Sequence, residues 1–236
     1  MLISNKKKFI FIHIYKTAGT SVSRLFVTHA RFIDRLAYDF KLSSSLLGRF
    51  STLMKWQDDG FKQFTGFRKH SKASEIKNKL GTKKFNEYFK FIFVRNPFDL
   101  LVSLYHYINQ SPWHVDHQNV KSLNFKQFIV YHISKNPNLQ IDFMTDAGSG
   151  ELIVDYVGRF ETLNRDINEI KNKLNIDDDE KLQHKNSSKG RKNMDYKSFY
   201  DSESIEIVNQ YYKNDLEKLG YNFSGISREN ILGVNL

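Results

Sequence analysis

The chain of 236 residues has no cysteine, only three prolines and no apolar run long enough to cross a membrane. Without cysteine there is no disulfide and no zinc–thiolate site, which is typical of proteins in a reducing compartment. The basic N-terminal residues precede an apolar run that has no small-residue cleavage site, so the pattern of a signal peptide is missing too. We therefore expect a cytoplasmic protein.

Acidic residues are also in the minority, because 36 Lys and Arg face 26 Asp and Glu, for a formal net charge of +10. Such a balance favours a polyanionic partner, which could be a nucleotide, an acidic glycan, a nucleic acid or an anionic membrane. Aromatic residues make up 14% of the chain and supply a sizeable core. We find no repeat and no linker, and predict one domain over residues 1–221 with a tail over 222–236.

Hydrophobic patterning predicts strands that alternate with helices. The predicted strands are 8–14, 61–67, 89–94 and 152–157, and the predicted helices are 20–31, 72–80, 84–88, 97–109, 124–134, 162–174 and a last one from Asp201 to Gly220. Ser71 and Asn96 are expected N-caps, with Pro97 at the first helical position. Residues 110–123 and 177–193 are expected to be loops, and residues 32–60 are expected to combine turns with one or two short helices. This order predicts an α/β fold with a mostly parallel sheet and helices on both faces.

The first strand runs into a turn that resembles an anion cradle. Residues 15–21 read Tyr-Lys-Thr-Ala-Gly-Thr-Ser, and a helical pattern follows at once. A strand, a tight turn and a helix N-terminus together present backbone N–H groups to an anion. Lys16 would add a positive charge, and the hydroxyl groups nearby would add donors. A phosphate or sulfate site is expected here.

Basic residues follow the other predicted strands as well. Lys16, His70, Arg95 and Arg159 each come just after one of the four strands. Ligands of parallel sheets bind at the carboxyl ends of the strands, so these side chains are expected at one edge. The sequence therefore predicts a single anion site.

The turn does not fit the Walker A pattern of ordinary ATPases and GTPases. Its lysine comes before its single glycine, and no strand ends in a clear magnesium-binding aspartate. His114, Asp116 and His117 have no further ligands near them and more often bind no metal. We expect an anion site without an obligatory metal.

Several motifs, taken in order, resemble those of the family 2 (carbohydrate) sulfotransferases. They are residues 12–21 (IHIYKTAGTS), 93–97 (FVRNP) with Ser103, 157–161 (VGRFE), 184–189 (HKNSSK) and the aromatic and acidic residues over 195–221. The resemblance implies a P-loop-NTPase-like three-layer sandwich. It also implies sulfuryl transfer from 3′-phosphoadenosine 5′-phosphosulfate (PAPS) to a hydroxyl or amine, usually of a sugar, with adenosine 3′,5′-bisphosphate (PAP) as product.

The resemblance also assigns roles to residues. Lys16 would neutralise the leaving phosphate, and Thr17, Ala18, Gly19, Thr20 and Ser21 would line the 5′-phosphosulfate site. Arg95 and Ser103 would bind the 3′-phosphate, and His70 is a suitable general base. Lys189, Gly190 and Arg191 would lie over the nucleotide. The partners are then a nucleotide donor and a glycan acceptor, with no nucleic acid, and a polysaccharide pathway would place the enzyme at the membrane periphery.

Other interpretations of the same residues are open. Arg95 could form a structural ion pair, Ser103 could bond its own helix, and His70 could be an ordinary surface histidine. Arg159 is more typical of a structural pair with Glu161. Two departures from the family pattern are Tyr15, where proline is usual, and Leu100, where arginine is common.

Two other functions are compatible with parts of the sequence. A P-loop-like kinase or nucleotide hydrolase would depend on magnesium and bind ATP. A nucleic-acid-binding module would use scattered lysines along one groove instead of clusters after strands.

Overall fold

The computed structural model describes most of the chain, in two compact units that are treated separately below. It describes residues 1–30, 67–178 and 195–228. The first unit is Met1–Phe93 with Phe143–Gln183, and the second is Val94–Asp142 with His184–Leu236. The prediction of one domain over residues 1–221 stays a prediction.

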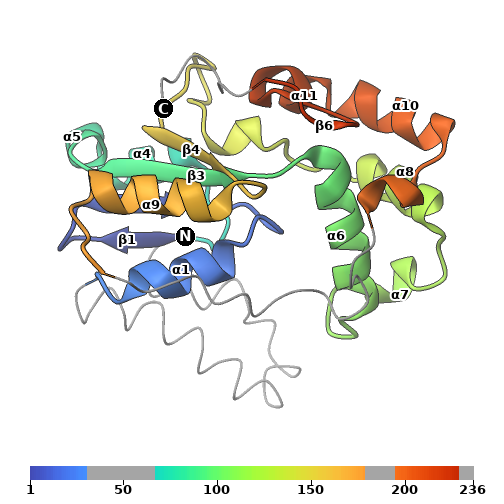
Figure 1. The fold of residues 1–236 in the computed structure, drawn as a ribbon, viewed down its shortest axis with the longest axis horizontal. Helices are drawn as coiled ribbons and strands as arrows, with labels where there is room; N and C mark the ends of the chain where they lie inside the picture. Colours follow the sequence, from blue (N-terminus) through green and yellow to red (C-terminus); the bar gives the residue numbers. More distant parts are fainter. Residues whose placement is uncertain (31–66, 179–194, 229–236) are drawn as a thin grey trace. The chain divides into compact units, whose positions relative to one another are not determined.

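The first unit is built on a four-stranded sheet in the order β1-β2-β3-β4 (Figure 1). Its strands are β1 (Leu2–Ser4), β2 (Phe9–Ile12), β3 (Phe89–Val94) and β4 (Tyr156–Arg159). β1 runs antiparallel to β2, whereas β2 and β3 are parallel, with Phe9 opposite Phe89. The mostly parallel sheet confirms the predicted fold class.

Helices of the first unit cover both faces of this sheet. They are α1 (Gly19–Val27), α4 (Ala73–Leu80), α5 (Thr82–Asn86) and α9 (Leu163–Lys173). One face presents the rings of Phe9, Phe11, Phe91 and Phe93 to α1 and α9, which form a single buried cluster with them. Strand residues alternate between faces, and the Lys90 ammonium lies 5.3 Å from the centre of the Phe85 ring in α5, on the opposite face. The predicted three layers are therefore present.

The second unit is mainly helical among its described residues. Its elements are α6 (Pro97–Asn109), α7 (His117–Val120), α8 (Phe125–Ser134), η3 (Tyr196–Phe199), α10 (Ser202–Tyr211), α11 (Lys213–Leu219), β5 (Tyr221–Asn222) and β6 (Gly225–Ile226), while the short η2 (Ile141–Phe143) lies at its boundary in the chain. The Asn96 side chain accepts from the Phe98 N–H, and Pro97 opens α6. Both features follow the sequence prediction.

Some predicted elements are wrong in their bounds. The strand predicted over 152–157 is β4, which begins only at Tyr156, because Leu152 forms an isolated bridge with Thr145 instead. The predicted loop 110–123 contains α7, the predicted last helix is divided at Tyr212 into α10 and α11, and part of the predicted tail 222–236 forms the hairpin β5–β6. The segments 32–60 and 179–193, and the strand predicted over 61–66, lie outside the described residues.

Helix α4 also begins differently from the prediction. It starts at Ala73, and neither Ser71 nor the N-cap residue Lys72 caps it with a side chain. The Ser71 hydroxyl accepts from the Arg68 N–H at 3.0 Å and closes a turn that contains His70. Gly81 ends α4 with a φ of 80°, as predicted. Within the described part of the chain, no helix is both long and apolar enough to cross a membrane.

Candidate functional site

The turn between β2 and α1 holds two non-glycine residues in the left-handed region. Lys16 has a φ of 62° and Ala18 a φ of 61°. Each such residue costs on the order of 1–2 kcal/mol, and strain of this kind gathers at functional sites. The Ala18 carbonyl accepts from the N–H groups of Ser21 and Val22, which starts α1 at Gly19. The turn therefore ends at a helix N-terminus, as the sequence predicts.

The Thr17 side chain has a structural task in this turn. It is fully buried, and its hydroxyl donates to the Ile14 carbonyl at 3.0 Å. Because the hydroxyl proton of Thr17 is already donated inside the turn, the group of Thr17 that could donate to an anion is its backbone N–H. The hydroxyl-bearing residues Thr20 and Ser21 are only partly buried.

Position 19 must be a glycine because it lies in close contact with His13, a contact that the sequence did not predict. A Cβ atom at this position would lie 1.8 Å from Cδ2 of His13 and 2.0 Å from its Nε2. His13 is only 5% exposed, and its ring stacks on Phe11 with 5.9 Å between the ring centres. The sequence signal for this contact was weak, since a histidine that ends a buried strand is more often part of the core.

His70 lies beside the same strand end. Its Nδ1 is 2.7 Å from the His13 carbonyl oxygen, and the two imidazole rings are 4.7 Å apart. The Tyr15 ring meets His70 edge-on at 6.3 Å. The first unit therefore brings the expected base together with the residues of the anion-binding turn.

Arg159 differs from its predicted position. It is the last residue of β4, not the first residue beyond a strand, and it is 3% exposed. Its backbone N–H donates to Asp166 at 2.6 Å, and the Thr162 hydroxyl donates to the same carboxylate. Asp166 therefore links the end of β4 to α9, which the sequence did not predict, and the pair of Arg159 with Glu161 stays a prediction.

Arg95 and Ser103 lie in the second unit. Arg95 follows β3 directly and is 5% exposed, and its Nε donates to the Asp99 carboxylate at 2.6 Å. Arg95, Asp99 and Ser103 are spaced by four residues, which places them along one side of α6 and its entry. Ser103 is buried as well. The ion pair that the sequence left as an alternative for Arg95 is thus present.

The backbone of Arg95 is held from a distant part of the second unit. Its N–H donates to the Gln140 side chain at 2.9 Å, and its carbonyl accepts from the same amide at 2.8 Å. The N–H groups of Gln140 and Ile141 in turn donate to the buried carboxylate of Asp215. Burial raises the pKa of Asp215 to about 6, although these two donors act in the opposite direction.

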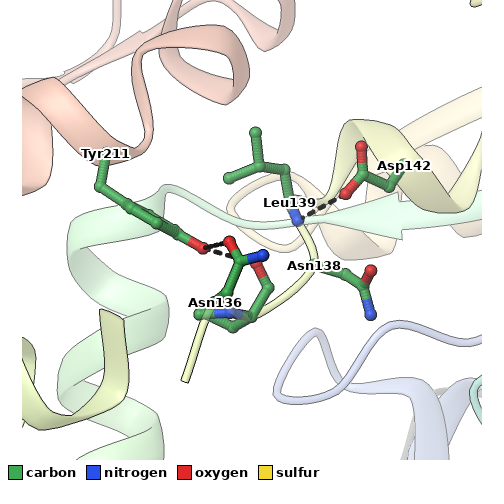
Figure 2. A pocket seen from close by; sticks show the side chains of 6 residues that line it. Asn136, Asn138, Leu139, Asp142 and Tyr211 are labelled. Carbon is green, nitrogen blue, oxygen red and sulfur yellow. Dashed lines mark hydrogen bonds between the residues drawn. The ribbon is translucent and has the colours of Figure 1, made fainter. Parts of the chain in front are cut away.

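A pocket of about 250 Å³ in the second unit is lined by residues 136–139 and by Asp142 and Tyr211 (Figure 2). In Figure 2 the Tyr211 hydroxyl reaches the Pro137 carbonyl at 2.8 Å and the Asn136 amide oxygen at 3.2 Å. Asp142 accepts from the Leu139 N–H, and Asn138 completes the polar lining. Burial raises the pKa of Tyr211, so its hydroxyl is neutral at physiological pH. Amide, carboxyl and phenol groups of this kind hydrogen-bond neutral polar ligands.

The predicted site residues Lys189, Gly190 and Arg191 lie outside the described residues. His114 Nδ1 accepts from the Asp116 N–H, and burial lowers the pKa of His114. Over residues 1–30, 67–178 and 195–228, no group of three or more His, Cys, Asp or Glu could hold a metal ion.

Comparison with known proteins gives one match. A family model described as the sulfotransferase family matches residues 1–222, which include every motif described above. No curated protein and no solved structure matches the chain. Because the family model covers far more than half of its length, this chain belongs to the sulfotransferase family.

Proposed function

We propose that this enzyme transfers the sulfuryl group of PAPS to a hydroxyl or amine of a carbohydrate acceptor by in-line displacement. Family membership establishes sulfuryl transfer in general, and the donor and acceptor are our proposal. The observation that carries this proposal is the turn from β2 to α1. Lys16 lies in this turn, and Gly19 is the first residue of the helix that follows. A turn of this kind suits the 5′-phosphosulfate of the donor.

The anion-binding turn would stabilise the leaving phosphate. Lys16 would place its ammonium against the bridging oxygen as negative charge develops there. N–H groups of Thr17, Gly19 and Thr20 would hold the same phosphate, because the first N–H groups of a helix have no partner inside it. The strained backbone supports this role, since the fold maintains two left-handed residues in three positions.

Arg95 and Ser103 would bind the 3′-phosphate of the donor. Nε of Arg95 donates to Asp99, and this ion pair fixes the orientation of the guanidinium group that would bind the phosphate. A nucleotide without the 3′-phosphate would forfeit this interaction.

His70 would accept the proton of the acceptor hydroxyl. It is partly buried and lies against the turn that carries Lys16, which supports a position beside the reacting group. Histidine has an ordinary pKa near 6.5, which suits a general base at neutral pH. Its proposed role needs no metal ion.

A glycan acceptor fits two further features of the chain. The net charge of +10 would favour acidic sugars, and the pocket beside Tyr211 offers groups that hydrogen-bond sugar hydroxyls. The family match favours this proposal over the kinase, hydrolase and nucleic-acid-binding alternatives. We expect a soluble nucleotide donor and no nucleic-acid partner.

The test is the thermal stability of the full chain in titrations with PAP, AMP and ATP, each with and without magnesium. A ligand at one hundred times its Kd stabilises the folded state by about 2.7 kcal/mol, which is several degrees in Tm. PAP is expected to raise Tm more than AMP, and magnesium is expected to add nothing. A rise with magnesium-ATP and none with PAP would instead support a kinase or hydrolase.

A further inference from the structure

His70 is contacted by two side chains and one carbonyl group from the end of a single strand. The His13 carbonyl lies 2.7 Å from Nδ1, the His13 ring is 4.7 Å away at an angle of 57°, and the Tyr15 ring is 6.3 Å away at 82°. All three groups belong to residues 13–15, which directly precede Lys16. The imidazole of His70 is thus placed by the same short segment that forms the anion-binding turn.

The contact with the carbonyl determines where the proton of His70 resides. A carbonyl oxygen can only accept, so Nδ1 must donate at a separation of 2.7 Å. In the neutral ring only one nitrogen carries a proton, and here that nitrogen is Nδ1. Nε2 then carries the lone pair and is the nitrogen able to take a proton from a substrate hydroxyl.

The His13 ring has little freedom to move. It stacks on Phe11 at an interplanar angle of 18°, and the backbone of Gly19 lies close to Cδ2, Nε2 and Cγ of the same ring. With 5% of its surface exposed, it has little room for another rotamer. A movement of the His13 ring would therefore displace both the backbone at Gly19 and the ring of His70.

We propose that His13 is a positioning residue that holds His70 as the Nδ1–H tautomer and ties it to the anion-binding turn. Tyr15 supports the ring of His70 from a second direction. The catalytic meaning of this arrangement rests on the proposed function, whereas the tautomer does not. It rests on the contacts of His70 with the carbonyl and the ring of His13.

The experiment is two-bond ¹H–¹⁵N NMR of the histidine rings in the full chain, with His70→Gln used to assign the His70 signals. This spectrum reports which ring nitrogen bears the proton. At a pH where His70 is neutral, the wild type is expected to carry it on Nδ1. A wild-type His70 protonated on Nε2 would overturn the inference without the need for any other variant.

His13→Ala keeps the backbone carbonyl and removes the ring that packs against the imidazole of His70. Without that packing the imidazole can turn away from the carbonyl, so we expect a folded protein in which His70 becomes a mixture of both tautomers. Phe26→Leu is the matched control, because Phe26 lies in the core of the same unit, against Phe9 and Phe91, without contacting His70. The control is expected to lower Tm and leave the tautomer unchanged, and an unchanged tautomer in folded His13→Ala would refute the positioning role.

PAP titration separates this inference from the proposed function. An Nδ1–H tautomer that depends on His13, in a protein that PAP does not stabilise, would support the placement of His70 and argue against the donor. PAP stabilisation together with an Nε2–H tautomer would do the reverse. The two ideas can thus fail independently.

Discussion

Gly19 and His13 are in such close contact that a methyl group on Gly19 would fall 1.8 Å from Cδ2 of the imidazole ring. The backbone of Gly19 does not have a positive φ, so alanine would be tolerated there if the ring were absent. This contact makes the glycine a requirement of space and not of backbone conformation. It also gives a way to test the geometry of the turn with two substitutions.

Gly19→Ala is expected to lower stability by roughly 1–3 kcal/mol, because overpacking forces the ring or the turn to move. The rise in Tm produced by PAP should be lost with it. His13→Ala in the same chain removes the clash, so the double variant should regain the stability and the PAP response relative to Gly19→Ala. A double variant no better than Gly19→Ala would show that the contact is not the cause.

Lys16→Ala is expected to reduce sulfuryl transfer by about 10²–10³-fold, as for the loss of one electrostatic contact to a leaving group. Reverse transfer from 4-nitrophenyl sulfate to PAP measures this without a known acceptor, since it releases 4-nitrophenol and forms PAPS. Lys6→Ala, at an exposed lysine of the same unit, is the control and should retain full activity. Full activity in Lys16→Ala would remove the assigned role.

Arg95→Ala should raise the Kd for PAP by roughly ten- to a hundred-fold and change that for AMP little. The substitution also leaves the buried Asp99 carboxylate without this partner, at a cost of about 3 kcal/mol in stability. The double variant Arg95→Ala/Asp99→Ala separates the two effects, because it should recover stability but not PAP affinity. Equal losses for PAP and AMP would argue against the 3′-phosphate assignment.

The raised pKa of Asp215 predicts a pH dependence of stability. The folded state binds this proton more tightly than the unfolded chain does, so the free energy of unfolding should fall as pH rises from about 4 to about 6. Asp215→Asn removes this titration, so the stability difference between wild type and variant, from urea unfolding at several pH values, should shrink over that range. A constant difference would contradict the raised pKa.

The sequence predicted the central strands of the first unit, the end of α4 and the start of α6 well because the signals there are local. The runs that form β2 and β3 are apolar on both faces, and Asn96-Pro97 starts α6 where expected. Gly81 ended α4 as predicted. The turn after β2 and the helix that begins at Gly19 were predicted from the order of residues 15–21. In each case neighbours in the chain determine the outcome.

Elements that depend on distant contacts were mispredicted. Leu152 to Val154 look like a strand, but β4 begins at Tyr156, and the Phe93 ring lies against Gly158 where a Cβ atom would be 2.5 Å away. β1 has three residues and is too short to form a pattern. The division at Tyr212 interrupts no hydrophobic periodicity, so nothing in the sequence marked it.

In the candidate site, the residues proposed to bind the anion come from sequence motifs, whereas the residues that the structure places against them were not predicted. His13 lies next to Gly19 only in the folded chain, and Gln140 reaches Arg95 across 45 positions. Asp99 could have been found, because an acid four residues after an arginine is the spacing of a helical ion pair.

The double amide contact between Gln140 and Arg95 has a consequence for affinity. Arg95 is held by its backbone, by Asp99 at its guanidinium group, and through Gln140 by Asp215. The entropy lost in ordering this arginine is therefore lost when the chain folds and not when a ligand arrives. Substitution of Gln140, which touches no proposed ligand, should weaken the proposed phosphate binding by restoring freedom to the backbone that carries the Arg95 side chain.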